Sequence, residues 1–202
     1  MAGRRRLGRD ERRQQIIDVT LESVAECGVR GTTLSRIAAG VGVTTPALYA
    51  HFANRKEILL AALDVLFEQR TAIHRQTISG TAVERLREIA RSHAQLVVGP
   101  NERSVLALFE FIAAPPEEGL RETLGAKHLL LVKDIADLVR EGQREGSIRT
   151  DVDPEQTAWM IVGRAWSEDI TQLLGIADAW TESQSNAMLN LILGSIAVSP
   201  LA

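Results

Sequence analysis

Apolar residues recur along this chain at helical spacing, and glycine or proline interrupts the pattern at intervals. In the first stretch, Ile17, Leu21 and Val24 fall on one face of a helix over residues 10–28, which Gly28 ends. Further helices are expected over residues 54–79, 82–98, 102–113, 117–145, 154–174 and 181–198, the fourth of these with a candidate break near Gly125. No segment alternates for long enough to predict a strand, so the pattern predicts an all-α fold of about nine helices.

Two of the helix starts carry strong local signals. Asn54 and Glu57 have the spacing of a capping box, in which two side chains each bond a backbone N–H at the helix start. Asp153 precedes Pro154 and stands three residues before Gln156, which combines a cap, a first-turn proline and a capping-box partner. Both segments therefore predict the beginning of a helix.

Residues 33–52 predict two short helices joined by a tight turn. The first has one apolar face, formed by Leu34, Ile37, Ala38 and Val41. Gly42 permits the turn, a following threonine can cap the second helix, and Leu48 and Phe52 form its inward face. A helix so short and exposed is poorly suited to forming a core alone. It fits the recognition helix of a helix-turn-helix motif, which enters a DNA major groove.

The outward positions of this second helix carry small and aromatic side chains. The candidates for contact with base edges are Thr44, Thr45, Ala47 and Tyr49, because hydroxyls can donate or accept there and methyl groups can touch thymine. Tyr49 and His51 also have polar tips that can reach phosphates or sugars. An alternative role for Tyr49 is a core aromatic that ties the two helices together. Neither arginine nor asparagine lies on this helix, so specificity must come partly from elsewhere.

Arginines suited to phosphate contact lie in two places, one inside the motif and one before it. Arg36 lies three residues after Thr33, where a helix start favours an acid, and a cation there fits an expected phosphate. The alternative is a plain solvated arginine. The run from Arg4 to Arg6 lies in a basic flexible arm, residues 1–9, that either enters a minor groove or raises affinity without sequence preference.

Residues 10–70 resemble the N-terminal domain of the tetracycline-repressor (TetR) family of bacterial transcription regulators. The resemblance is carried by Thr33-Leu34, Ile37-Ala38, Gly42-Val43-Thr44, Leu48-Tyr49, His51-Phe52 and Asn54-Arg55-Lys56-Glu57. Val41 departs from it, since the family often has alanine there, and we expect that change to affect packing only. The resemblance makes Lys56 a phosphate ligand. The DNA-binding residues expected are Arg4, Arg5, Arg6, Thr33, Arg36, Thr44, Thr45, Pro46, Ala47, Tyr49, His51 and Lys56.

The formal charge of the chain, −3, is unevenly distributed. Residues 1–56 contain ten Lys or Arg against five Asp or Glu, and residues 57–202 contain thirteen against twenty-one. The resulting charges of +5 and −8 place the electrostatic footprint for a nucleic acid at the N-terminal end.

Other features of the sequence indicate the compartment. A single cysteine, Cys27, expected in the core of the first helix, fits a reducing cytoplasm. The basic start lacks the apolar run of a secretory signal, and no apolar run is long enough to span a membrane. We therefore expect a cytoplasmic protein with no membrane partner.

The remaining two thirds of the chain carry no catalytic signature. The histidines, His51, His74, His93 and His128, lack metal-ligand spacing. The acid pairs Glu117-Glu118 and Glu168-Asp169 are expected to be solvated helix faces. The sequence therefore predicts no enzyme, no cofactor and no metal.

The last two helices are apolar on more than one face, so they must be covered on most sides. If these two helices pack against the same two helices of a second copy of the chain, they form a four-helix dimer interface with twofold symmetry, as in the family. Burial within one chain is the alternative. The interface residues expected are Ile161, Ala165, Met188, Leu191, Ile192 and Ser195.

The resemblance also implies an effector, small and apolar or aromatic, held among the helices after the DNA-binding domain. The candidate lining residues are His93, Phe109, Phe111, His128, Trp159 and Trp166, with Arg164 at the edge. Taken singly, each is better interpreted as ordinary core or surface.

Together these features predict a helix-turn-helix domain over residues 10–56 and an effector-binding and dimerisation domain over residues 57–202. The predicted function is a ligand-responsive repressor that binds a palindromic operator in double-stranded DNA as a homodimer. One alternative is a DNA-binding regulator or architectural protein without an effector. Another is a helical enzyme with a DNA-binding appendage, which would need converging polar groups in a cleft.

Overall fold

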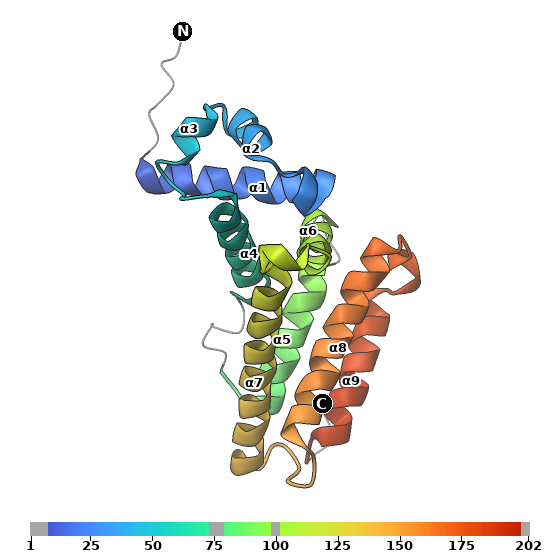
Figure 1. Cartoon of the computed structure of the whole chain (residues 1–202). Helices are drawn as coiled ribbons and strands as arrows, with labels where there is room; N and C mark the ends of the chain where they lie inside the picture. The colour runs from blue at the N-terminus through green and yellow to red at the C-terminus, as the bar shows by residue number, and fades with distance from the viewer. Residues whose placement is uncertain (1–7, 73–78, 98–101, 199–202) are drawn as a thin grey trace. The chain divides into compact units, whose positions relative to one another are not determined.

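The computed structural model describes residues 8–72, 79–97 and 102–198, and within these ranges the protein is all-α, as predicted (Figure 1). The helices are α1 (Arg9–Gly31), α2 (Leu34–Val41), α3 (Thr45–Leu48), α4 (Arg55–Thr71), α5 (Ala82–Val97), α6 (Glu102–Ile112), α7 (Leu120–Glu145), α8 (Pro154–Leu173) and α9 (Glu182–Ile196). Two 3₁₀ turns, η2 (Pro116–Glu118) and η3 (Ala177–Ala179), precede α7 and α9. Over the described ranges, no helix has the length and apolar character that crossing a membrane requires.

The predicted caps form. The Asn54 side chain accepts a hydrogen bond from the Glu57 N–H at 2.9 Å, and the Asp153 side chain accepts one from the Gln156 N–H at 2.8 Å. Each bond satisfies a backbone donor that has no partner within the first helical turn. The predicted starts of α4 and α8 are therefore confirmed.

Three helix boundaries differ from the expectation. Gly28 has a left-handed φ of +73° and interrupts the regular helix at the predicted position, but a further short helical stretch follows, so α1 extends to Gly31 across a kink. The helix expected to reach Ser79 ends at Thr71, and Ser79 itself is not helical. α7 begins at Leu120 and passes through Gly125 without a break, because a single glycine costs a helix only about 1 kcal/mol relative to alanine.

The helices form two compact units. Unit 1 comprises the chain up to Gln69 together with Leu106–Leu124, and unit 2 comprises Arg70–Val105 and Gly125–Ala202. The domain boundary expected after residue 56 therefore does not divide the units. Three helices, α4, α6 and α7, begin in one unit and end in the other.

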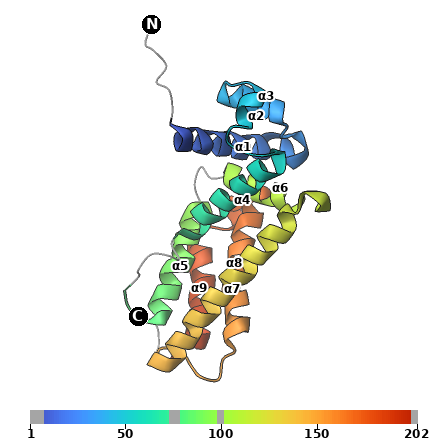
Figure 2. The same ribbon diagram turned by 60° about the vertical axis from the view of Figure 1, so that its left-hand side comes forward.

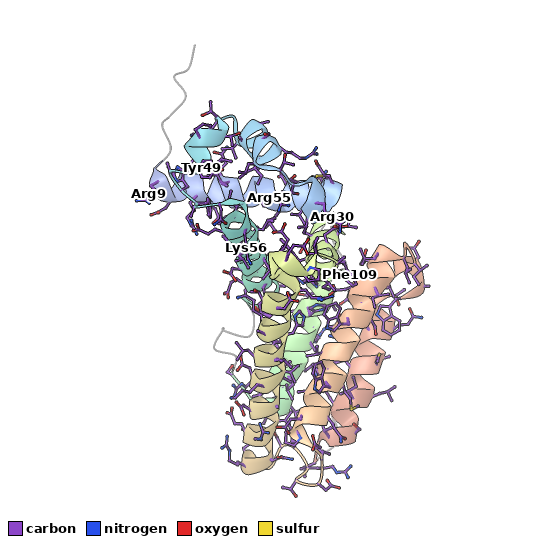
Figure 3. The ribbon with its side chains drawn as sticks, viewed as in Figure 1. Arg9, Arg30, Tyr49, Arg55, Lys56 and Phe109 are labelled. Atoms are coloured by element: carbon purple, nitrogen blue, oxygen red, sulfur yellow. The ribbon has the colours of Figure 1, made fainter. Side chains whose placement is uncertain are left out.

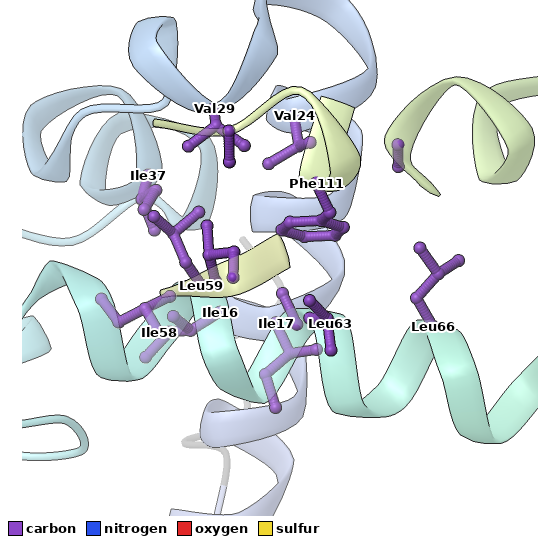
Figure 4. Close-up of a cluster of buried hydrophobic side chains, with 14 of the residues drawn as sticks. Ile16, Ile17, Val24, Val29, Ile37, Ile58, Leu59, Leu63, Leu66 and Phe111 are labelled. Atoms are coloured by element: carbon purple, nitrogen blue, oxygen red, sulfur yellow. The ribbon is translucent and has the colours of Figure 1, made fainter. Parts of the chain in front are cut away.

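In unit 1, α1 lies between the α2–α3 pair and α4 in both ribbon views (Figures 1 and 2). Its core contains residues from every helix of the unit, including Ile16, Val24, Ile37, Leu59, Leu63 and Phe111 (Figure 4). Phe111 comes from Leu106–Leu124 and is fully buried. The segment Leu106–Leu124 therefore completes the core on which the helix-turn-helix rests.

Unit 2 has a separate core formed by α5, α8, α9 and most of α7. Its fully buried apolar residues include Ala82, Leu86, Val139, Ala158 and Leu193. Both ribbon views show α8 and α9 side by side (Figures 1 and 2).

Candidate nucleic-acid interface

The α2–α3 pair buries one face in unit 1 and exposes the other. Leu48 and Phe52 are buried, which fixes α3 against the core. The exposed residues on and beside α3 are Thr44, Pro46, Ala47 and Tyr49, and Thr45 is half-buried. Tyr49 lies at the end of α3 with 53% of its surface exposed (Figure 3). An aromatic side chain this exposed is not a core residue.

Thr33 and Arg36 lie at the start of α2. The Thr33 hydroxyl accepts a hydrogen bond from the Arg36 N–H at 3.2 Å and so caps the helix. The Arg36 guanidinium lies 3.0 Å from the Glu26 carboxylate, with both side chains about half exposed. Because exposed ion pairs contribute little stability, a phosphate can replace Glu26 as the partner of Arg36 at small cost.

Arg55, the first residue of α4, points into unit 1. Its Nε donates to the Thr32 carbonyl at 2.7 Å, and its Nη2 donates to the Val29 carbonyl. Its Nη1 pairs with the Glu118 carboxylate of η2 at 2.5 Å. Arg55 therefore ties the α1–α2 junction to the turn before α7, a role that the sequence pattern did not reveal.

Lys56 is exposed, but it does not lie with the α2–α3 face. Its ammonium lies beside Gly119, 3.3 Å from the point that a Cβ on that residue would occupy. In the view of Figure 3, Lys56 lies on the other side of α1 from α3. The position of Lys56 thus gives no support to the expected phosphate contact, because the side chain extends toward the start of α7.

Two other expectations concern His51 and the arm. His51 is half-buried, and its Nδ1 is buried without a hydrogen-bond partner among the described residues. Its ring is therefore only partly available to DNA. Arg4, Arg5 and Arg6 lie outside the described residues.

The residues expected to line an effector pocket do not come together as one set. Phe111 belongs to the core of unit 1, so its assignment to a pocket wall is wrong. Trp159 is 51% exposed on α8, so it is also not a lining residue in this structure. Phe109 is half-buried and falls in unit 1, whereas His93, His128 and Trp166 are half-buried in unit 2. The His128 and Trp166 rings are in contact, with centroids 5.0 Å apart.

Unit 2 contains a buried polar network centred on Arg164, which is 1% exposed. Its Nη1 donates to the Glu168 carboxylate and, at 2.7 Å, to the Ser185 hydroxyl, and its Nη2 donates to the Ala90 carbonyl at 2.6 Å. Burial lowers the pKa of Arg164, and the nearby Glu168 carboxylate opposes that shift. Arg164 therefore sits in the interior of the unit and not at the edge of a pocket.

Two further residues extend the network. His93 Nδ1 lies 2.9 Å from the Glu168 carboxylate, and Arg70 Nη2 lies 2.5 Å from the Asp169 carboxylate. Glu168 and Asp169 are both buried, so the expectation of a solvated acidic face is wrong. His93 and Arg70 stand 75 and 99 positions away from Glu168 and Asp169 in sequence, beyond the reach of local pattern. Arg164, four positions before Glu168, is a local partner.

Large apolar side chains are exposed on α8 and α9, and together they are called the exposed apolar face of the two helices. They are Trp159, Met160 and Ile170 on α8, Leu174 directly after it, and Leu191 on α9. Of the interface residues expected, Leu191 is 76% exposed, Ser195 is exposed, and Ala165 and Met188 are half-buried. Ile161 and Ile192 lie in the core of unit 2, so their assignment to an interface is wrong. Both helices are apolar on two sides, and periodicity alone does not show which side faces inward.

Comparisons with known proteins agree with this arrangement. A family model described as "Bacterial regulatory proteins, tetR family" matches residues 16–62. A second, described as "Tetracyclin repressor-like, C-terminal domain", matches residues 79–166. The transcriptional repressor KstR2 of Mycobacterium tuberculosis is 27% identical over 167 residues, which cover 78% of this chain and 79% of KstR2.

Two solved structures extend the comparison. A TetR-family transcriptional regulator from Rhodococcus sp. superimposes with a TM-score of 0.74 at 25% identity, covering 92% of this chain and 98% of that one. AibR, in complex with isovaleryl coenzyme A and operator DNA, superimposes with a TM-score of 0.64 at 23% identity, covering 93% and 98%. Because both the DNA-binding and the C-terminal family models match in order, and the folds agree over nearly the whole length, this chain belongs to the TetR family of bacterial regulatory proteins.

Proposed function

We propose that this protein is a ligand-responsive transcriptional repressor that binds a palindromic operator as a homodimer and catalyses no reaction. The observation that carries the proposal is the exposed face of α2–α3. There Tyr49 projects beside Thr44 and Ala47 while Leu48 and Phe52 hold α3 on the core. Those side chains suit contact with base edges and thymine methyl groups in a major groove.

DNA binding is tested with a duplex selected from a random pool by the wild-type protein. Tyr49→Ala should weaken binding by about tenfold, within the roughly 1–3 kcal/mol that a base contact contributes. Arg36→Ala should weaken binding to all sequences and lower the slope of affinity against salt by about one unit, as one fewer phosphate is neutralised. Fluorescence anisotropy at several salt concentrations measures both effects.

Arg144→Ala is the matched control, because Arg144 is also an exposed arginine but lies on α7 in unit 2. It should bind DNA as the wild type does. If Tyr49→Ala binds DNA with wild-type affinity, α3 is not the surface that contacts the bases. An unchanged salt slope in Arg36→Ala would remove Arg36 from the phosphate contacts.

The homodimer is proposed to form through the exposed apolar face of α8 and α9. Trp159, Met160 and Leu191 are each about half exposed or more in the single chain, and large exposed apolar patches mark interaction sites. A twofold partner presents the same face in return, which matches the symmetry of a palindromic site.

The effector is proposed to be small and apolar or aromatic, with His93, His128 and Trp166 in unit 2 as candidate contacts. AibR was solved with isovaleryl coenzyme A, so that thioester is a reasonable first probe, with free coenzyme A as the control. If the protein binds neither isovaleryl coenzyme A nor free coenzyme A, the next probes are apolar molecules that lack the coenzyme A moiety.

Coupling between effector and DNA is proposed to pass along helices that span both units, with α4 as the main lever. An effector can release DNA only if it binds the non-DNA-binding conformation more tightly. A typical coupling of about 1–3 kcal/mol changes DNA affinity roughly 5- to 150-fold, and DNA must weaken effector binding by the same factor. Calorimetry with and without the selected duplex measures this reciprocity, and equal effector affinities in the two titrations would contradict it.

A further inference from the structure

The turn that follows α3 determines where Tyr49 points. α3 is only four residues long, and the hydrogen bonds around its end are local: the Tyr49 N–H donates to the Pro46 carbonyl at 3.2 Å and the His51 N–H to the Leu48 carbonyl at 2.9 Å. An isolated turn of this length has little intrinsic stability. Contacts from elsewhere in unit 1 must therefore fix its orientation.

Arg13 of α1 provides such contacts from a distant part of the sequence. Its Nη1 donates to the His51 carbonyl at 2.9 Å, across 38 positions of sequence. Its guanidinium carbon lies 4.0 Å from the centroid of the Phe52 ring, within the range of a cation–π contact. The Arg13 side chain thus contacts the turn at two points: the backbone of His51, two residues after Tyr49, and the buried ring of Phe52, three residues after it.

Glu57 completes the arrangement from the α4 side. One of its carboxylate oxygens accepts from the Ala53 N–H at 2.6 Å, and the other lies 3.9 Å from Arg13 Nη1. Arg13 and Glu57 therefore contact the same turn, Arg13 from α1 and Glu57 from α4. The Arg13–Glu57 ion pair is half exposed and contributes little to stability. The contacts of Arg13 with His51 and Phe52 therefore do most to fix the position of the turn.

We propose that Arg13 is a positioning residue for DNA recognition: it orients Tyr49 by locking the turn after α3, and it is not a phosphate ligand. This inference rests on the proposed reading of DNA by the α2–α3 face. Arginine suits the role because its planar guanidinium stacks on a ring while its N–H groups donate in the guanidinium plane, whereas lysine offers a point charge without a plane. A lysine at this position would keep the charge and lose the geometry.

The first test needs no DNA. Tyr49 is the only tyrosine in the chain, so a protein labelled with ¹⁵N-tyrosine gives one backbone amide signal, and that signal reports the turn. Arg13→Ala and Arg13→Lys should both shift or broaden it. Arg12→Ala is the matched control, because Arg12 is the neighbouring arginine on α1 and bonds Gln15 on the same helix; it should leave the Tyr49 signal in place. An unperturbed signal in both Arg13 variants would overturn the proposal.

The second test compares binding of the selected duplex and of a scrambled duplex, at temperatures well below each variant's melting midpoint. Arg13→Ala and Arg13→Lys should both lower the preference for the selected duplex by about tenfold, equivalent to one lost base contact, with the wild-type salt slope retained. A phosphate ligand would behave differently: Arg13→Lys would bind almost normally, and Arg13→Ala would lower the salt slope by about one unit. That result would overturn the proposal.

The two tests separate this inference from the proposed function. If the wild-type protein selects no sequence from the pool, the proposed function fails, while the Tyr49 signal still shows whether Arg13 locks the turn. If selection succeeds and the Tyr49 signal does not respond to Arg13, the positioning role alone fails.

Discussion

Replacing Phe111 with alanine tests whether Leu106–Leu124 is structurally part of the DNA-binding unit. Phe111 is 0% exposed and packs in the core of unit 1 with Val24 and Leu63. A buried Phe→Ala change costs about 3–5 kcal/mol, because it removes apolar contact and leaves a cavity. For a domain whose whole stability is about 5–15 kcal/mol, that is a large fraction.

Hydrogen exchange followed by mass spectrometry resolves where the loss falls. In Phe111→Ala, exchange of the slowest amides of α1 and α4 should accelerate by about two to four orders of magnitude, the equivalent of 3–5 kcal/mol. Operator binding should fall with it. Tryptophan fluorescence should change less, because all three tryptophans, Trp159, Trp166 and Trp180, belong to unit 2.

Leu193→Ala provides the opposite control. Leu193 is fully buried in the core of unit 2, and its loss should cost about 2–5 kcal/mol there. The assignment of Phe111 to unit 1 would be refuted if Phe111→Ala accelerated amide exchange in α5, α8 and α9 as much as in α1, or more. It would restore the expectation that Phe111 lines a site elsewhere.

Three further changes have definite expected outcomes. Leu191→Arg, on the exposed face, should give a folded monomer in sedimentation, whereas Ile192→Arg buries an unpaired charge and should unfold unit 2; a stable Leu191→Arg dimer would move the interface elsewhere. Arg164→Ala leaves a buried carboxylate without its cation and should lower the free energy of unfolding in urea by about 3–5 kcal/mol; a loss below 1 kcal/mol would show that the network is dispensable. A hydrogen bond from the Ser147 hydroxyl lowers the pKa of Glu145. The stabilisation is therefore present above the unfolded pKa and lost as pH falls through the folded one, so Glu145→Gln should melt with less dependence on acid pH than the wild type.

The features that the sequence predicted correctly depend on residues close together in the chain. The caps at Asn54 and Asp153 need only the next three positions, and the turn at Gly42 needs one left-handed residue. The inward face of α3 follows from Leu48 and Phe52, four positions apart. Local pattern was therefore sufficient for the all-α class and for the helix-turn-helix.

The errors concern partners that lie far away in sequence. Glu168 was expected in solvent because the residues that cover it, His93 and Ser185, belong to other helices, although its ion-pair partner Arg164 is local. Phe111 was expected in a pocket because its neighbours belong to α1 and α4. For Ile161, an apolar pattern on two sides of one helix left the inward side undetermined. Arg13 could not be assigned at all, since its contacts with the turn after α3 cross 38 positions.

The discontinuity of unit 1 bears on how the protein folds as it is synthesised. Helices α1 to α3 leave the ribosome early, but the core beneath them lacks Phe111 and Leu120 until the chain has grown past residue 124. At about 5–20 residues per second, the stretch from residue 70 to residue 124 takes roughly 3–11 s to synthesise. During that interval Ile16, Val24 and Leu63 remain without part of their apolar cover. Nascent chains stalled at residue 70 should therefore bind chaperones, and those stalled well beyond residue 124 should release them.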